Sequence, residues 1–396
     1  MKISTFIALL FLISYDLFGF FEKSNTTTPL LILIVLIFYG LVFKRKSNSL
    51  LNTYANRKYV YFFLAILILS TFQPLYSFGQ PFFDTMISLR VNYLIIVVLL
   101  LIHMRPSEGD IIKAFKFCSY LAISIAFLST FLPGLFISND IYDAANIRRD
   151  NGGLELFYFT PGLDLVFFYF IFLTARLKKE NNKKHIIEVV VLLVFLILVQ
   201  NRSRLAFAIP FFVFMFLSKY KFKPIQLLMF FSLVTMILSR YRMIFNNQIN
   251  ETLSDLSNND YPRIKTLEYI YNSAINSPYT IFTGNGVSSA NSEYLEKLQL
   301  LQYEDNIFIA DLGLIGGFYN FGVLFLIFVY SFCFKSFKRY QPLYLKCFSV
   351  FIILMPSIQG FGTNYFLGPV VFFCFYFYLI FYFESTQKPR YISYER

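Results

Sequence analysis

The chain has 396 residues, of which 57% are hydrophobic and only 15% are charged. A soluble domain of this size buries only about 75% of its surface on folding, so it could not hide this much apolar surface from water. The formal net charge of +12 would suit a nucleic-acid partner, but the basic residues alternate with apolar runs, as membrane topology signals do. We therefore expect a membrane protein with no nucleic-acid partner.

Apolar runs long enough for a helix to cross about 30 Å of hydrocarbon recur along the whole chain. They cover residues 3–21, 29–43, 59–78, 87–104, 114–136, 156–175, 186–200, 205–218, 225–239, 307–333, 344–359 and 365–383. The pattern predicts an all-α fold, a polytopic bundle of about twelve transmembrane helices. This bundle would form a single integral membrane domain over residues 1–396.

Every second connection between these runs is basic. The series begins with Lys44-Arg45-Lys46 and continues through residues 105–113, 176–184, 219–223, 335–339 and 388–396. Because loops rich in lysine and arginine stay in the cytoplasm, both termini are predicted to be cytoplasmic. Most lysines fall on this cytoplasmic side.

Several arginines fall on the outer side instead, against the orientation rule. They are Arg148, Arg149, Arg202, Arg204, Arg240, Arg242 and Arg263. The planar fork of a guanidinium matches phosphate or carboxylate oxygens, which gives these arginines a reason to be there. For Arg202 and Arg204, which lie where one run ends and the next begins, a role as snorkelling anchors stays open. Residues two apart on a helix point to nearly opposite sides, and we favour Arg204 as the one that faces the bundle.

The external loop before the sixth run reads NIRRDNGG over residues 146–153. Its paired arginines and glycines suit a loop that approaches an anion closely, although an ordinary solvated loop is equally compatible. Asp164, which follows Pro161-Gly162, is expected to be an internal hydrogen-bond partner rather than a functional acid.

The longest polar segment, residues 240–306, lies between the ninth and tenth runs and is predicted to be a large periplasmic loop. It is too long for a passive connection. Ile264, Leu267, Ile270 and Ala274 recur at helical spacing, which predicts an amphipathic helix. Gly284-Asn285-Gly286 is typical of a tight turn.

Glu304, Asp305 and Asn306 lie at the external mouth of the tenth run. A carboxylate there could accept a proton from an attacking hydroxyl, although helix N-capping explains Asp305 equally well. The two histidines, His103 and His185, both fall on the cytoplasmic side, so no external chemistry can depend on them. The four cysteines show no metal-ligand spacing, and no metal is expected.

Four of these pieces occur in a recognisable order. Arg149, Gly152 and Pro161 come first, followed by Ser203-Arg204, then Arg263 with Gly284 and Gly286, and last Asp305-Asn306 with Gly313-Leu314-Ile315-Gly316. In this order the chain resembles the O-antigen polymerase and O-antigen ligase superfamily, known as the Wzy, WaaL and Wzy_C-type proteins. The resemblance covers most of the chain in topology and consists of short motifs.

The resemblance implies a GT-C-like glycosyltransferase at the outer face of the bacterial inner membrane, with its active site facing the periplasm. Its partners would be membrane lipid, an undecaprenyl-pyrophosphate-linked oligosaccharide as substrate, and a chain-length regulator protein. No metal, nucleotide sugar or other cofactor is implied. The donor diphosphate would be held by an arginine set and the acceptor hydroxyl oriented or deprotonated by Asp305 or Glu304. The catalytic residues would be Asp305, Glu304 and Arg204, and the substrate-binding set would be Arg149, Arg148, Arg202, Arg263, Arg242 and Asn306.

Ligases of this group carry a functional histidine before the asparagine, where this chain has Asp305 before Asn306. This departure favours a polymerase, which moves the growing glycan to the non-reducing end of a new lipid-linked repeat unit. Three alternatives stay open: an O-antigen ligase that moves glycan to lipid A-core, a lipid-linked oligosaccharide flippase, and a scaffold in an export complex. A flippase would bury cations along a central cavity, whereas here the arginines gather at one face.

Overall fold

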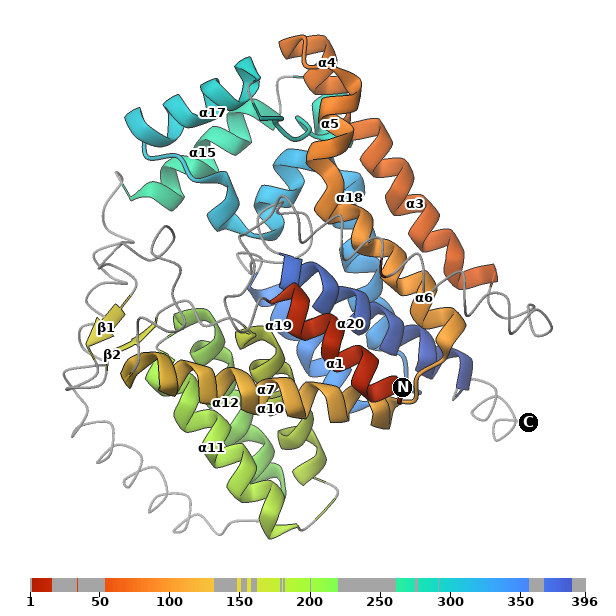
Figure 1. Cartoon of the computed structure of the whole chain (residues 1–396), viewed down its shortest axis with the longest axis vertical. Helices are drawn as coiled ribbons and strands as arrows, with labels where there is room; N and C mark the ends of the chain where they lie inside the picture. The colour runs from red at the N-terminus through yellow and green to blue at the C-terminus, as the bar shows by residue number, and fades with distance from the viewer. Residues whose placement is uncertain are drawn as a thin grey trace.

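The structure is an almost entirely helical bundle (Figure 1). This computed structural model describes residues 2–15, 34, 54–131, 148–150, 155–157, 162–178, 180, 182–199, 201–219, 261–274, 277–290, 292–355 and 367–386. The helices are α1 (Ile3–Ser14), α3 (Tyr54–Ser70), α4 (Phe72–Phe78), α5 (Phe82–Ser88), the 3-10 helix η1 (Leu89–Ile95), α6 (Ile96–Met104), α7 (Glu108–Phe131), α10 (Leu163–Leu177), α11 (Lys183–Val199), α12 (Arg202–Lys219), α15 (Pro262–Ala274), α16 (Pro278–Thr283), α17 (Glu293–Glu304), the 3-10 helix η3 (Ile309–Leu312), α18 (Leu314–Ser336), α19 (Leu343–Leu354) and α20 (Leu367–Thr386). One antiparallel hairpin joins β1 (Arg148–Asp150) to β2 (Glu155–Phe157).

Several of these helices are long and apolar enough to cross a membrane. Within the described residues there are 5 such segments: Lys58–Phe78, Phe82–Met104, Glu108–Leu128, Leu314–Ser336 and Gly368–Thr386. Shorter apolar helices cover Ile3–Ser14, Ser203–Phe216 and Leu343–Leu354. The prediction of a helical membrane protein is therefore confirmed. The number of twelve spans stays a prediction, because the run at 225–239 and all but one residue of the run at 29–43 lie outside the described residues.

One predicted span, the run at 156–175, begins too early. The run at 156–175 was expected to be helical throughout, but Glu155–Phe157 pairs with Arg148–Asp150 in the hairpin, and α10 begins only at Leu163. Gly162 adopts a left-handed φ of 79° immediately before it, which few other residues would tolerate. The apolar residues of β2 continue the apolar run of the following helix, so hydropathy alone cannot separate the strand from the helix.

The core of the bundle is built around α10 and α20. Nearly every side chain of α10 is buried, and this helix packs against α7, α11, α12 and α19. The stretch from Val370 to Phe381 in α20 is also buried, where it packs against α1, α6 and η1. Aromatic rings fill much of the space between them, as in the pair Phe168 and Phe348, whose ring centroids lie 5.1 Å apart.

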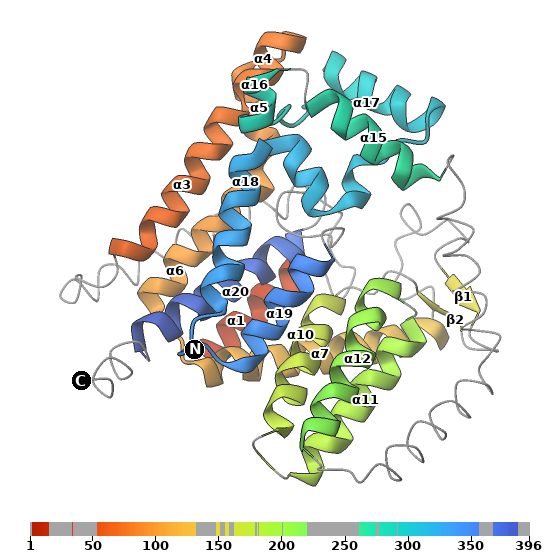
Figure 2. The same cartoon turned by 180° about the vertical axis from the view of Figure 1, so that it is seen from behind.

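Helices α15, α16 and α17 lie together at one end of the molecule, at the top of Figures 1 and 2. They pack on α18, α3 and α4, while α10, α11 and α12 lie at the opposite end of the same views. The predicted helix around residues 264–274 is confirmed as α15. Its buried side is formed by Thr266 and Ile270, whereas Leu267 is 41% exposed and does not belong to it.

A break in α18 joins this end to the membrane helices. Gly322, inside α18, has a non-helical φ of 71° and ψ of −169°. The backbone N–H of Asn285 donates to Tyr319 O at 2.7 Å, and that of Gly286 donates to Asn320 O at 2.9 Å. The Gly284-Asn285-Gly286 segment thus donates to two carbonyls next to the break in the helix.

Candidate functional site

The side chains of Tyr15, Asp164 and Arg204 meet where the ends of α1, α10 and α12 converge. The Nη2 of Arg204 donates to Oδ1 of Asp164 in an ion pair. The hydroxyl of Tyr15 donates to the other carboxylate oxygen, Oδ2, at 3.4 Å. The side chains of Arg204 and Asp164 are only 13% and 14% exposed. The prediction that Arg204 faces the bundle is therefore confirmed.

An asparagine cap places Arg204 in the first turn of α12. Asn201 Oδ1 accepts a hydrogen bond from the backbone N–H of Arg204 at 3.2 Å and one from the Ser203 hydroxyl at 3.0 Å. This is the pattern of an N-cap residue, which satisfies amide groups that have no partner within the helix. Because α12 begins at Arg202, Arg204 is the third residue of this helix and lies in its first turn, close to the start of α10.

The partners of Arg204 are placed by glycines on two other helices. Asp164 is the second residue of α10, two residues after the left-handed Gly162, and a carboxylate in a first helical turn is favourable. Tyr15 follows the last residue of α1, and its ring lies against Gly368 near the start of α20. A Cβ at Gly368 would overlap that ring. The three side chains are therefore held by four helices.

Arg204 keeps unused hydrogen-bonding capacity in this arrangement. Its Nε is buried and has no hydrogen-bond partner among the described residues. A guanidinium carries five N–H donors in a fixed fork, so one bond to Asp164 leaves several free. Burial of a charge is costly unless the charge is paired, and Asp164 offsets that cost without saturating the fork.

The other predicted site residues are not joined to this cluster. Arg148 and Arg149 belong to β1 and Arg202 is the first residue of α12, but the structure does not describe their side chains. Arg242 lies outside the described residues altogether. Arg263, in α15, is exposed, and no hydrogen bond or ion pair between described residues joins it to Arg204.

Glu304, Asp305 and Asn306 form the end of α17 and are all exposed. The backbone N–H groups of Asp305 and Ile307 both donate to Leu301 O, at 3.2 and 3.1 Å. Asn306 has a left-handed φ of 58°, a frequent conformation one residue past a helix end. The alternative that Asp305 caps the start of the next helix is therefore wrong, because it lies at the C-terminal end of the preceding one.

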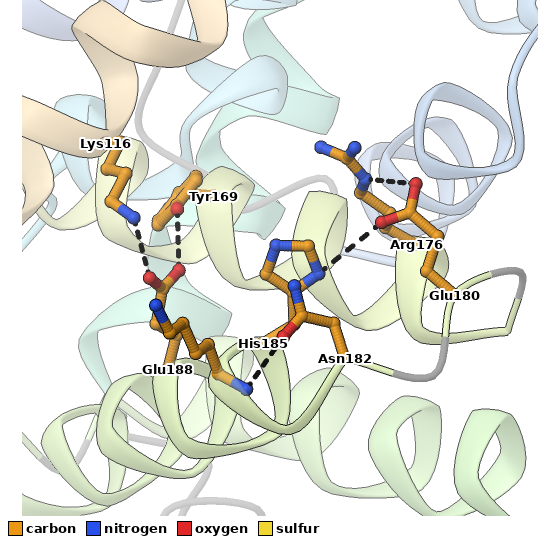
Figure 3. Close-up of polar contacts among 8 residues, drawn as sticks. Lys116, Tyr169, Arg176, Glu180, Asn182, His185 and Glu188 are labelled. Atoms are coloured by element: carbon orange, nitrogen blue, oxygen red, sulfur yellow. Dashed lines mark hydrogen bonds and ion pairs between the residues drawn. The ribbon is translucent and has the colours of Figure 1, made fainter.

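A second polar cluster lies toward the lysine-rich end of α10 and α11 (Figure 3). Lys116 and Tyr169 both donate to the carboxylate of Glu188, at 2.6 and 3.0 Å. His185 Nδ1 lies 3.7 Å from the carboxylate of Glu180. His185 is at the start of α11 and Arg204 follows its end, so a helix of about 25 Å separates the two side chains.

Sequence reasoning identified Arg204 but missed the residues that hold it. Asp164 was expected to be an internal hydrogen-bond partner, and the structure gives it two such partners. Nothing in the local sequence singled out Tyr15, which is 149 residues from Asp164 in the chain. No protein-family model matches the chain, and no curated protein matches it. The described fold defines a helical membrane protein with a buried arginine–aspartate pair.

Proposed function

We propose that this protein is a surface-polysaccharide polymerase of the O-antigen type in a bacterial inner membrane. It would transfer a growing glycan from undecaprenyl pyrophosphate to the non-reducing end of a lipid-linked repeat unit. The observation that carries the proposal is the largely buried Arg204, whose Nη2 is paired to Asp164 in a helical membrane bundle and whose Nε has no partner among the described residues. The order of short sequence motifs described above adds to it.

The reaction is a glycosyl transfer that needs no redox step. An acceptor hydroxyl oxygen attacks the anomeric carbon of the donor glycan, and the bond between that carbon and the diphosphate oxygen breaks. The electron pair leaves with the diphosphate, and the hydroxyl proton passes to a base. Growing charge on the leaving diphosphate must be stabilised in the transition state, and a fixed guanidinium does this without reorganisation.

The residues fall into named roles under this proposal. Arg204 would stabilise the departing diphosphate, and Asp305 or Glu304 would orient or deprotonate the acceptor hydroxyl. Both carboxylates are exposed at the end of α17, where a large hydrophilic acceptor can reach them. The remaining donor-binding residues would be Arg148, Arg149, Arg202, Arg242 and Arg263, with Asn306 on the acceptor side.

Topology follows the charge rule under the same proposal. The lysine-rich ends and both termini would face the cytoplasm, and Arg204 and helices α15 to α17 would face the periplasm. The bundle would belong to the GT-C class, and a chain-length regulator protein would be its partner.

Deletion of the gene in its native host tests the proposed activity. We expect the ladder of long glycans on gels to collapse to caps of one repeat unit, because ligation and transport continue without polymerisation. The full-length chain supplied from a plasmid should restore the ladder. Loss of all surface glycan would instead indicate a ligase or a flippase, and an unchanged ladder would contradict a role in glycan assembly.

A further inference from the structure

The orientation of the Arg204 guanidinium depends on the residues that contact it. An arginine side chain has four rotatable bonds and loses considerable rotamer freedom when it is fixed in one geometry. At 13% exposure, the guanidinium of Arg204 has little water to solvate its charge. Its ion pair with Asp164 is the contact that both orients the fork and compensates the burial.

Asp164 is itself fixed through its second oxygen. Oδ1 accepts from Arg204 and Oδ2 accepts from the Tyr15 hydroxyl, so the carboxylate is bonded at both ends. Tyr15 cannot swing away toward α20, because its ring already lies against Gly368. A rigid relay therefore runs from α20 through Tyr15 and Asp164 to Arg204. Such a relay holds a functional group to the fraction of an ångström that transfer chemistry requires.

We propose that Asp164 is a positioning residue for Arg204, with Tyr15 as its support, and that this relay holds the Arg204 guanidinium in the orientation in which it meets the anionic donor. The inference rests on the proposed function, since it assigns how that same site is oriented. Asp164 does not touch the reacting atoms in this account. The negative charge of Asp164 neutralises Arg204 when no substrate is bound. An anion would therefore bind favourably only if it accepted hydrogen bonds from guanidinium N–H groups that Asp164 does not occupy.

Asp164→Glu is the sharpest variant. Glutamate keeps the negative charge and can still pair with Arg204, but its extra methylene moves the carboxylate outward and shifts the guanidinium. We expect normal protein level and a fall in glycan transfer of at least about tenfold, because small misplacements of a fixed group are costly. The fall should be in kcat, measured on purified protein. Tyr15→Phe, which removes only the 3.4 Å bond, should lower the rate by about two- to tenfold.

Two comparisons separate positioning from a merely structural ion pair. In a double-mutant cycle, Asp164→Ala with Arg204→Ala should be no worse for transfer than Arg204→Ala alone, because the relay acts only through Arg204. Exchange of the two residues, Asp164→Arg with Arg204→Asp, should recover thermal stability relative to the single changes but not transfer.

The outcomes are distinguishable from failure of the proposed function. If Arg204→Ala abolishes the ladder while Asp164→Glu and Asp164→Asn both keep wild-type kcat at normal protein level, the positioning role is wrong and the transferase stands. Recovery of transfer by the exchanged pair would also overturn the positioning role. If Arg204→Ala itself leaves the ladder intact, the proposed function fails first.

Discussion

Replacement of Arg204 by alanine is expected to lower glycan polymerisation by about 100- to 1,000-fold, the usual cost of one preorganised donor in a transition state. The ladder of long glycans should collapse to single-repeat caps while the protein still accumulates in the membrane. The reason is electrostatic. Under the proposed function, the departing diphosphate would gain charge beside a guanidinium that is only 13% exposed, where a fixed cation contributes more than it would in water.

Arg204→Lys separates charge from geometry at the same position. Lysine keeps the positive charge but replaces the planar fork by a compact ammonium that cannot bond to two oxygens in one plane. We expect a loss of about tenfold or more, smaller than that of alanine.

Arg176→Ala is the matched control for both changes. Arg176 is exposed, lies at the other end of α10 and forms an ion pair with Glu180 four residues on, at 2.9 Å. Exposed pairs of this kind contribute about 0.5 kcal/mol or less, so the ladder should be unchanged. A ladder that survives both Arg204 variants at normal protein level would remove Arg204 from the donor site.

Gly284→Ala is expected to be strongly destabilising. A Cβ there would overlap the backbone of Asn320 and Phe321, and Gly284 has a φ of 76° that disfavours alanine. With its ψ of −178°, Gly284 occupies a backbone region that is essentially restricted to glycine, and this strain costs an alanine about 1–3 kcal/mol. Overpacking against backbone, which cannot rotate away, adds about 1–3 kcal/mol. The segment would separate from α18 and leave the carbonyls of Tyr319 and Asn320 without their donors.

Gly79→Ala provides the control for Gly284→Ala. Gly79 has a similar φ of 61°, but nothing lies within 4 Å of the Cβ that alanine would add. This variant therefore bears the conformational strain alone. Thermal unfolding in detergent should show a clearly larger loss of Tm for Gly284→Ala than for Gly79→Ala. Equal losses would show that the close approach of the Gly284 segment to α18 does not stabilise the fold.

Hydropathy and charge were sufficient to predict the class of fold. Long apolar helices follow directly from runs such as 87–104 and 114–136, because a membrane leaves a chain few other ways to satisfy its backbone. The helical spacing of Ile264, Leu267, Ile270 and Ala274 likewise predicted α15, although Leu267 is exposed. These features are local, so the sequence pattern carries them without knowledge of the neighbours.

Features that depend on distant parts of the chain escaped prediction. The break in α18 at Gly322 is accommodated by donors from residues 285 and 286, which no local pattern connects to it. The β1–β2 hairpin escaped because Leu156 and Phe157 are as apolar as the helix that follows. Helix α17 ends at Asp305 and Asn306 through backbone hydrogen bonds to Leu301 O, and the polarity of these residues alone does not reveal that they end a helix rather than begin one.

The candidate site divides in the same way. Arg204 was found because an arginine at a span end on the predicted outer side contradicts the orientation rule. Asp164 lies 40 residues from Arg204 in the chain, and Tyr15 lies 149 residues from Asp164. Only the packing of α1, α10 and α12 brings the three side chains together. A long-range ion pair between helices leaves no periodic signal in a single sequence.

Release of undecaprenyl diphosphate by the purified protein tests the central claim most directly. The protein in lipid nanodiscs would be given lipid-linked repeat units, and the leaving lipid diphosphate would be counted against glycosidic bonds formed. The wild-type chain should release one lipid diphosphate for each new bond, and Arg204→Ala should lower that rate by about 100-fold or more while it remains folded. No release by the wild-type chain, or an equal rate in the folded Arg204 variant, would contradict the claim that this guanidinium stabilises the departing diphosphate.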